Sequence, residues 1–129
     1  MKRFYAVTIA ITLALLSCTD SDTTVIDPSP PPKNTDTQAP TVPVGLIVST
    51  VSSSQINLAW NASEDDTKVE GYSVWRDGLP LEYVTDTFTS DKGLSASTSY
   101  CYQVSAYDKA NNMSNKSVQS CATTLSLPD

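Results

Sequence analysis

The sequence predicts an all-β fold, a single antiparallel sandwich of seven short strands. Three observations support this prediction. After Pro40, short runs alternate apolar with polar residues, turn-forming residues separate the runs, and no run has the 3.6-residue period and caps of an amphipathic helix. The expected strands cover residues 44–50, 55–61, 69–77, 81–85, 87–90, 99–108 and 116–124.

The alternation also predicts which side chains of these strands face a common core, because successive strand residues point to opposite faces. The residues that share the inward parity are Ile56, Leu58 and Trp60 in the second strand, Tyr72 and Val74 in the third, and Tyr100, Tyr102, Val104 and Ala106 in the sixth. Between the third and fourth strands, Asp77-Gly78 predicts a tight turn, because glycine adopts a positive φ without steric cost.

The first eighteen residues have the layout of an export signal. Lys2 and Arg3 precede an uncharged apolar run over residues 4–16, which is too short for an ordinary transmembrane helix. The run ends in Leu15-Leu16-Ser17-Cys18, which resembles the lipobox of bacterial lipoproteins. This resemblance implies a signal peptide over residues 1–17 and acyl chains on Cys18 that attach the protein to a membrane of the bacterial cell envelope. An ordinary signal peptide and a retained membrane helix are the alternatives.

Residues 18–39 follow as a predicted disordered tether. They are rich in Thr, Ser, Asp and Pro, with Pro28, Pro30, Pro31 and Pro32 close together, so they cannot bury a core and favour an extended chain. Thr19 after the cysteine, where enteric lipoproteins of the inner membrane carry Asp, implies an outer-membrane or cell-surface position. The folded domain is expected over residues 40–125 and a short tail over residues 126–129.

Several positions of the predicted domain match a known family. The residues concerned are Ala39, Pro40, Pro43, Leu46, Ile56, Leu58, Trp60, Gly71, Tyr72, Val74, Arg76, Asp77, Gly78, Leu94, Thr98, Tyr100, Tyr102, Val104 and Ala106. Their types and spacing over residues 39–125 resemble a fibronectin type III domain, with Ala96 where that family usually has proline. The resemblance implies an immunoglobulin-like sandwich with a tyrosine corner at Tyr100. It also implies an adhesive, ligand-binding or spacer role. Bacterial examples of the family are often appended to secreted enzymes that act on polysaccharides.

Two cysteines remain once Cys18 is assigned to lipid. Cys101 lies in the sixth strand and Cys121 in the seventh, and a hairpin centred near Asn111 places them opposite each other on the face away from the core. An exported protein oxidises such a pair, so we expect a disulfide. A metal-binding or redox-active thiol pair is the alternative.

Composition removes several classes of function. The chain has 129 residues, no histidine and a formal net charge of −6. Histidine-based catalysis and His-containing metal sites are therefore excluded, and a nucleic-acid partner is not expected. We predict no catalytic residues and no cofactor.

The acidic run Glu64-Asp65-Asp66 lacks the spacing of a known calcium motif, so a solvated turn is favoured over a calcium site.

Two aromatic residues are candidates for a binding surface. Trp75 and Tyr107 have the outward parity of their strands, so they lie on the outer face of the sheet, where they either bind a partner or cover neighbouring strands. We therefore expect a lipid-anchored, non-enzymatic module that binds an envelope protein or a polysaccharide. The alternative is a passive spacer or an accessory subunit of an envelope assembly or of a secreted polysaccharide-acting system.

Overall fold

The structure is a computed structural model and describes residues 35–129, in which every regular element is a strand. The strands are β1 (Ile47–Thr50), β2 (Gln55–Ala59), β3 (Val69–Arg76), β4 (Leu79–Val84), β5 (Phe88–Lys92), β6 (Ser99–Asp108) and β7 (Ser120–Thr123). Within these residues no helix is long and apolar enough to cross a membrane. The predicted seven-stranded all-β fold is confirmed.

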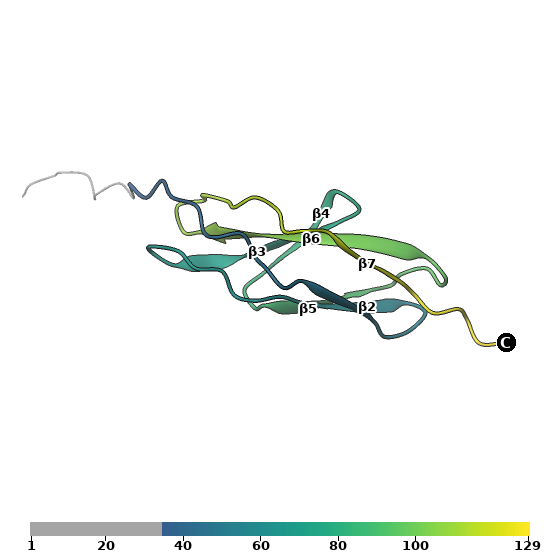
Figure 1. Ribbon diagram of the computed structural model, residues 1–129. Coiled ribbons are helices and arrows are strands. Elements are labelled where there is room, and N and C mark those ends of the chain that lie inside the picture. Colours follow the sequence, from purple (N-terminus) through teal and green to yellow (C-terminus); the bar gives the residue numbers. More distant parts are fainter. Residues whose placement is uncertain (1–34) are drawn as a thin grey trace, which may run out of the picture. The chain divides into compact units, whose positions relative to one another are not determined.

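The strands form two antiparallel sheets that pack face to face (Figure 1). One sheet has the order β1-β2-β5 and the other the order β4-β3-β6-β7. The chain therefore crosses between the layers after β2, after β4 and after β5, as in other antiparallel sandwiches. At one edge Thr50 of β1 donates its hydroxyl to the Thr123 carbonyl of β7, at 2.8 Å, which joins the two sheets.

The core lies between the inner faces of the two sheets. Its buried members are Ile56, Leu58, Trp60, Tyr72, Val74, Leu94, Tyr102, Val104 and Ala106. Trp60 and Tyr72 meet edge to face across the core, with ring centroids 5.5 Å apart. Each inward residue expected from the alternation contributes to this core, with Tyr100 at its margin and only partly buried.

Tyr100 has a different task from the other inward residues. Its hydroxyl accepts a hydrogen bond from the backbone N–H of Ser95, five residues earlier, at 3.0 Å. This contact fastens the loop before β6 to the strand itself. It is the tyrosine corner that the family resemblance implies.

The first and last strands are shorter than expected. β1 begins at Ile47 rather than at residue 44, because Gly45 has a φ of 72° and interrupts the extended run. β7 begins at Ser120 rather than at residue 116. Before it, Ser117 bonds Val104 with both its N–H and its hydroxyl, so the serine side chain takes the place of a regular ladder partner.

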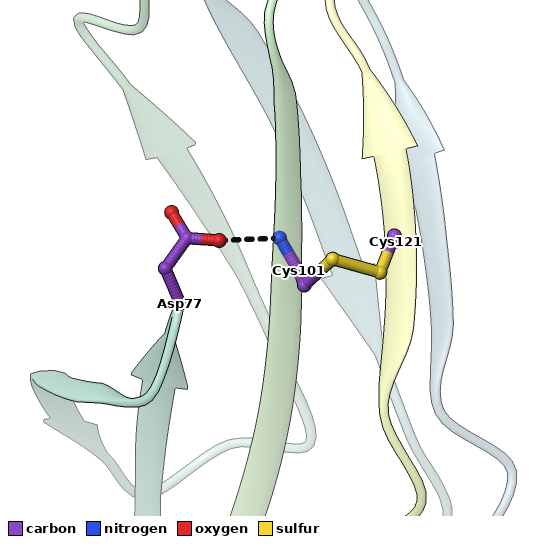
Figure 2. The surroundings of a disulfide bond; sticks show 3 residues. All are labelled: Asp77, Cys101 and Cys121. Carbon is purple, nitrogen blue, oxygen red and sulfur yellow. Dashed lines mark hydrogen bonds between the residues drawn. A yellow bond between two sulfur atoms is a disulfide. The ribbon is translucent and has the colours of Figure 1, made fainter.

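The two strands of the β3-β4 hairpin are joined by the predicted turn. Asp77 and Gly78 have φ values of 50° and 86°, the positive pair that a type I′ hairpin turn requires. The turn also contacts β6, because the Asp77 carboxylate accepts a hydrogen bond from the Cys101 N–H at 2.9 Å (Figure 2). The backbone N–H of Asp77 donates in return to the Cys101 carbonyl.

Cys101 and Cys121 form a disulfide on the face of the four-stranded sheet that points away from the core (Figure 2). The two residues are direct partners in the register of β6 and β7. The pairing predicted from the hairpin centre is therefore confirmed. The bond closes a loop of sequence separation 20 and ties the short edge strand β7 to β6.

Candidate binding surfaces

Trp75 lies on the outer face of the four-stranded sheet, as its parity predicts, but its indole is engaged within the domain. The indole N–H donates to the Ser105 hydroxyl at 3.1 Å. The ammonium group of Lys116 lies 3.6 Å from the centre of the ring, in a cation–π contact. A ligand that stacks on this ring face has to displace Lys116.

Tyr107 lies on the same face, above the backbone of Gly71. A Cβ atom at position 71 would lie 2.6 Å from the Tyr107 hydroxyl oxygen, so the glycine makes room for the ring. Tyr107 then meets Tyr83 of β4 edge to face, with centroids 5.7 Å apart. Tyr83 is 65% exposed and was not among the predicted surface residues. The β3-β4 register shifts at a bulge, so the alternation of β4 did not predict which face Tyr83 lies on.

The aromatic residues of this face cover polar groups of the sheet. Ser73 and Ser105 are partners across β3 and β6, and each is only 1% exposed although both point away from the core. Ser105 is bonded to Trp75, whereas the hydroxyl of Ser73 has no partner among the described residues. Trp75 and Tyr107 therefore act at least partly as a covering layer.

The outer face of the three-stranded sheet carries a second cluster, which the sequence did not reveal. Ile47, Ala59 and Phe88 are direct partners across β1, β2 and β5. Ile47 and Phe88 are each 63% exposed. They flank the small side chain of Ala59, and the sheet surface between them is hollowed by about 200 Å³.

A buried polar cluster links the two sheets at one end of the core. Asp91 of β5 is 6% exposed and accepts hydrogen bonds from Arg76 and from the Tyr102 hydroxyl, each at 2.8 Å. Burial raises the pKa of Tyr102, and the adjacent Asp91 carboxylate raises it further. The hydrogen bond to Asp91 likewise raises the pKa of Arg76. The cluster satisfies its own polar groups and is a structural feature of the interior.

The acidic loop lies beside the start of the described chain. Carboxylate oxygens of Asp36, Asp65 and Asp66 lie within 4.8 Å of one another. The Thr67 hydroxyl contacts both Asp36 and Asp65, and its hydrogen bond is the main reason why the pKa of Asp65 is lowered. Three carboxylates fall short of the six to eight oxygen ligands of calcium. The solvated turn expected at Glu64-Asp65-Asp66 remains a prediction.

Cys18, the predicted site of acylation, lies outside the described residues, as do the predicted signal peptide and most of the predicted tether. The remaining predicted site residues are all placed by the structure. Cys101 and Cys121 lie together in the disulfide, and Trp75 and Tyr107 share one sheet face.

Parts of polysaccharide-acting enzymes are similar to this chain. The chain is 45% identical over 93 residues to Exoglucanase B of Cellulomonas fimi, and the match covers 72% of this chain and 8% of that protein. It is 40% identical over 89 residues to Chitinase Chi52 of Paenibacillus xylanexedens, covering 69% of this chain and 17% of that enzyme. No family model matches the chain.

Solved structures identify the architecture. The chain superposes on the fibronectin type III domain of human fibronectin type III domain containing protein 3 with a TM-score of 0.61 at 20% identity, covering 72% of this chain and 93% of that one. The described residues form a fibronectin type III-like domain. Chitinase ChiA74 from Bacillus thuringiensis also contains a match, with a TM-score of 0.65 at 26% identity over 74% of this chain and 15% of the chitinase.

The fibronectin type III-like domain thus corresponds to a small part of each of these enzymes. The tyrosine corner at Tyr100 and the core positions Trp60 and Tyr72 have the places that the resemblance implies.

Proposed function

We propose that this protein is a lipid-anchored component of a bacterial cell envelope whose fibronectin type III-like domain is a non-catalytic binding module. Its partner is a polysaccharide or an envelope protein. One observation carries the proposal: the similar segments in an exoglucanase and a chitinase make up only 8% and 17% of those enzymes. A segment of that size accompanies a catalytic domain rather than replacing it.

The chemistry of the described residues supports a non-catalytic role. The buried carboxylate of Asp91 is engaged by Arg76 and Tyr102 rather than directed into a cleft. The chain has no histidine to act as a general base at neutral pH. An active site would need convergent polar groups in a pocket, and the hollow on the three-stranded sheet is lined by apolar and neutral side chains with no charged group.

The lipid anchor is the second part of the proposal and rests on the sequence. Leu15-Leu16-Ser17-Cys18 follows a basic segment and an apolar run, in the order of a lipoprotein signal. The tether rich in proline then gives the domain reach from the membrane surface. A module of this design presents its outer sheet faces to the cell wall or to the medium.

A passive spacer or accessory subunit is the second candidate. The observation that favours it is the contact of Lys116 with Trp75, because the aromatic residue best suited to a ligand is already covered. In that case the domain holds other proteins at a distance or joins them in an assembly. No ligand-binding patch is then required.

Co-sedimentation separates the two candidates. The full-length protein, kept soluble by a polyoxyethylene detergent, is mixed with insoluble chitin, cellulose and starch and with envelope preparations. Saturable loss from the supernatant with a polysaccharide, without release of reducing sugar, supports the binding module. Failure to bind any of the polysaccharides, together with a stable cross-linked complex with envelope proteins that substitutions at Trp75 and Tyr107 leave unchanged, supports the accessory role. Release of reducing sugar would contradict both candidates.

A further inference from the structure

The outer face of the three-stranded sheet contains a trough that runs along β2. Ala59 and Asn57 form its floor, since both point outward from the central strand. Ile47 and Ser49 of β1 line one side. Phe88 and Ser90 of β5 line the other. With β1 and β5 each about 4.8 Å from β2, the two sides are ~10 Å apart, which is wide enough for one sugar ring.

The trough has an apolar end and a polar end. At the apolar end, the Phe88 ring and the Ile47 side chain stand on either side of Ala59, and both are 63% exposed. The polar end lies two residues further along each strand, where Ser49, Asn57 and Ser90 are direct partners. An exposed aromatic ring beside hydroxyl and amide groups matches the two kinds of surface that a sugar ring presents, its C–H face and its hydroxyl groups.

Hydrogen bonds orient the polar end. The Asn57 side-chain oxygen accepts from the Gln55 amide at 2.9 Å and from the Ser90 hydroxyl at 2.8 Å. These two bonds use the oxygen and leave the Asn57 N–H groups as donors for a ligand. A hydroxyl-rich ligand can accept from Asn57 and exchange hydrogen bonds with Ser49.

The lining of the trough carries no charge, although the protein as a whole has a formal net charge of −6. The lining residues are Ile47, Ser49, Asn57, Leu58, Ala59, Phe88, Thr89 and Ser90. The ammonium group closest along the strands belongs to Lys92, whose register partner is Gln55, one pair beyond the polar end. A neutral lining offers nothing to compensate a ligand carboxylate or phosphate, so it suits an uncharged ligand.

We infer that this trough is a binding site for a neutral polysaccharide chain, with one sugar ring stacked on Phe88 above Ala59 and the next ring hydrogen-bonded to Ser49, Asn57 and Ser90. The inference rests on the proposed polysaccharide-binding function and gives it a location. It places the ligand on the sheet opposite to Trp75 and Tyr107. On that other face, Lys116 covers the indole, and Tyr107 packs against Gly71 and against Tyr83.

Titration of the full-length protein in a polyoxyethylene detergent tests the inference, since a detergent with a sugar head group would compete. The probes are cello-oligosaccharides and chito-oligosaccharides, with oligogalacturonate as the charged comparison, and heat of binding is measured. The test variants are Phe88→Ala, which removes the ring, and Ala59→Glu, which fills the floor with a charged side chain. Tyr83→Ala is the matched control, because Tyr83 is an equally exposed aromatic residue of the opposite face, at 65%.

We expect a neutral oligosaccharide to bind, and Phe88→Ala to weaken its binding about tenfold or more, as expected for an aromatic anchor. Ala59→Glu should weaken it at least as much, whereas Tyr83→Ala should change it by no more than about twofold. Thermal unfolding of each variant confirms that the domain is folded.

Four outcomes would overturn the inference. Binding that survives both Phe88→Ala and Ala59→Glu would leave the proposed function intact and move the site elsewhere. Equal binding of oligogalacturonate would contradict the neutral selectivity. If the protein binds no polysaccharide, the inference and the polysaccharide form of the proposed function both fail. Sedimentation velocity that shows self-association abolished by Phe88→Ala would assign the trough to a second copy of this chain instead.

Discussion

At the scale of single residues, Asp91 is a carboxylate that the fold buries, with 6% of its surface exposed. It shares the inward face of β5 because its register partner, Ile56, lies in the core. A carboxylate in that position needs compensation, and Arg76 and Tyr102 of the opposite sheet supply it. The cluster thus fixes how the two sheets meet at one end of the sandwich.

Tyr102 makes the stability of the domain sensitive to alkaline pH. Its pKa is raised in the folded state, whereas a tyrosine in the unfolded chain ionises near pH ~10. Above that pH the unfolded state binds fewer protons than the folded state, so the free energy of unfolding falls as the pH rises. Tyr102→Phe should remove this part of the decline. It should also cost about 1 kcal/mol at neutral pH, through the lost hydrogen bond to Asp91.

Urea unfolding of the two proteins over a series of pH values above and below 10 measures this effect. Tyr83→Phe is the control, because Tyr83 is 65% exposed. The control should keep the wild-type slope against pH. A Tyr102→Phe variant whose stability declines as steeply as the wild type above pH 10 would contradict the prediction.

At the scale of strands, the sequence predicted the central elements better than the edges. β2, β3 and β6 have alternating runs in which every second residue is apolar. Leu58, Val74 and Val104 are among these apolar residues, and the structure buries each of the three side chains. Edge strands depend on fewer partners, so local geometry decides where they end. Gly45 makes β1 begin later in the sequence than expected, and Ser117 does the same for β7. Neither effect shows in the alternation of apolar and polar residues.

The packing of Tyr107 on β3 depends on the absence of a side chain at Gly71. A Cβ atom there would lie 2.6 Å from the Tyr107 hydroxyl oxygen and 2.8 Å from the Val84 carbonyl oxygen of β4. The tyrosine can move, but the backbone carbonyl moves only with its strand. Gly71→Ala should therefore lower the free energy of unfolding by about 1–3 kcal/mol, the range for overpacking of a close contact.

Chemical denaturation of Gly71→Ala alone and combined with Tyr107→Phe measures both contacts. Removing the hydroxyl should restore part of the lost stability, with the remainder due to Val84. Full stability of Gly71→Ala on its own would show that the strands tolerate the extra methyl group. In that case the position of Tyr107 does not depend on the glycine.

The β6-β7 hairpin depends on its disulfide, because β7 has only four residues. Cys101 and Cys121 close a loop of sequence separation 20, and the chain-entropy estimate for such a loop is about 3 kcal/mol. Replacing both cysteines by serine should lower the free energy of unfolding by roughly that amount. Asp77→Asn keeps an acceptor for the Cys101 N–H and serves as a comparison with little expected effect.

Intact mass measurement of the exported wild-type protein provides the first check on this hairpin. Its mass should be two hydrogens below that of the reduced protein. Free thiols at both Cys101 and Cys121, or a double serine variant as stable as the wild type, would contradict the predicted contribution.

At the scale of the whole molecule, the fold followed from the sequence but the surfaces did not. Parity placed Trp75 and Tyr107 on an outer face, and the structure agrees. Parity could not show that Lys116 covers Trp75, because that contact joins residues far apart in the chain. It also missed Ile47 and Phe88, since their common row exists only when β1 and β5 both pair with β2.

The attachment of the molecule to the envelope is the broadest prediction, and it depends on Cys18. Acyl chains on this residue would provide the apolar surface that a membrane buries, and stable anchoring would need more than one chain. In a bacterial host fed a labelled fatty acid, the wild-type protein should carry label and sediment with membranes. Cys18→Ser should carry no label. Cys101→Ser, a cysteine replacement in the domain, should keep the label.

Label retained by Cys18→Ser would contradict the lipobox assignment. Unlabelled wild-type protein in the medium would indicate an ordinary signal peptide, and an unprocessed N-terminus in the membrane fraction would indicate a retained helix.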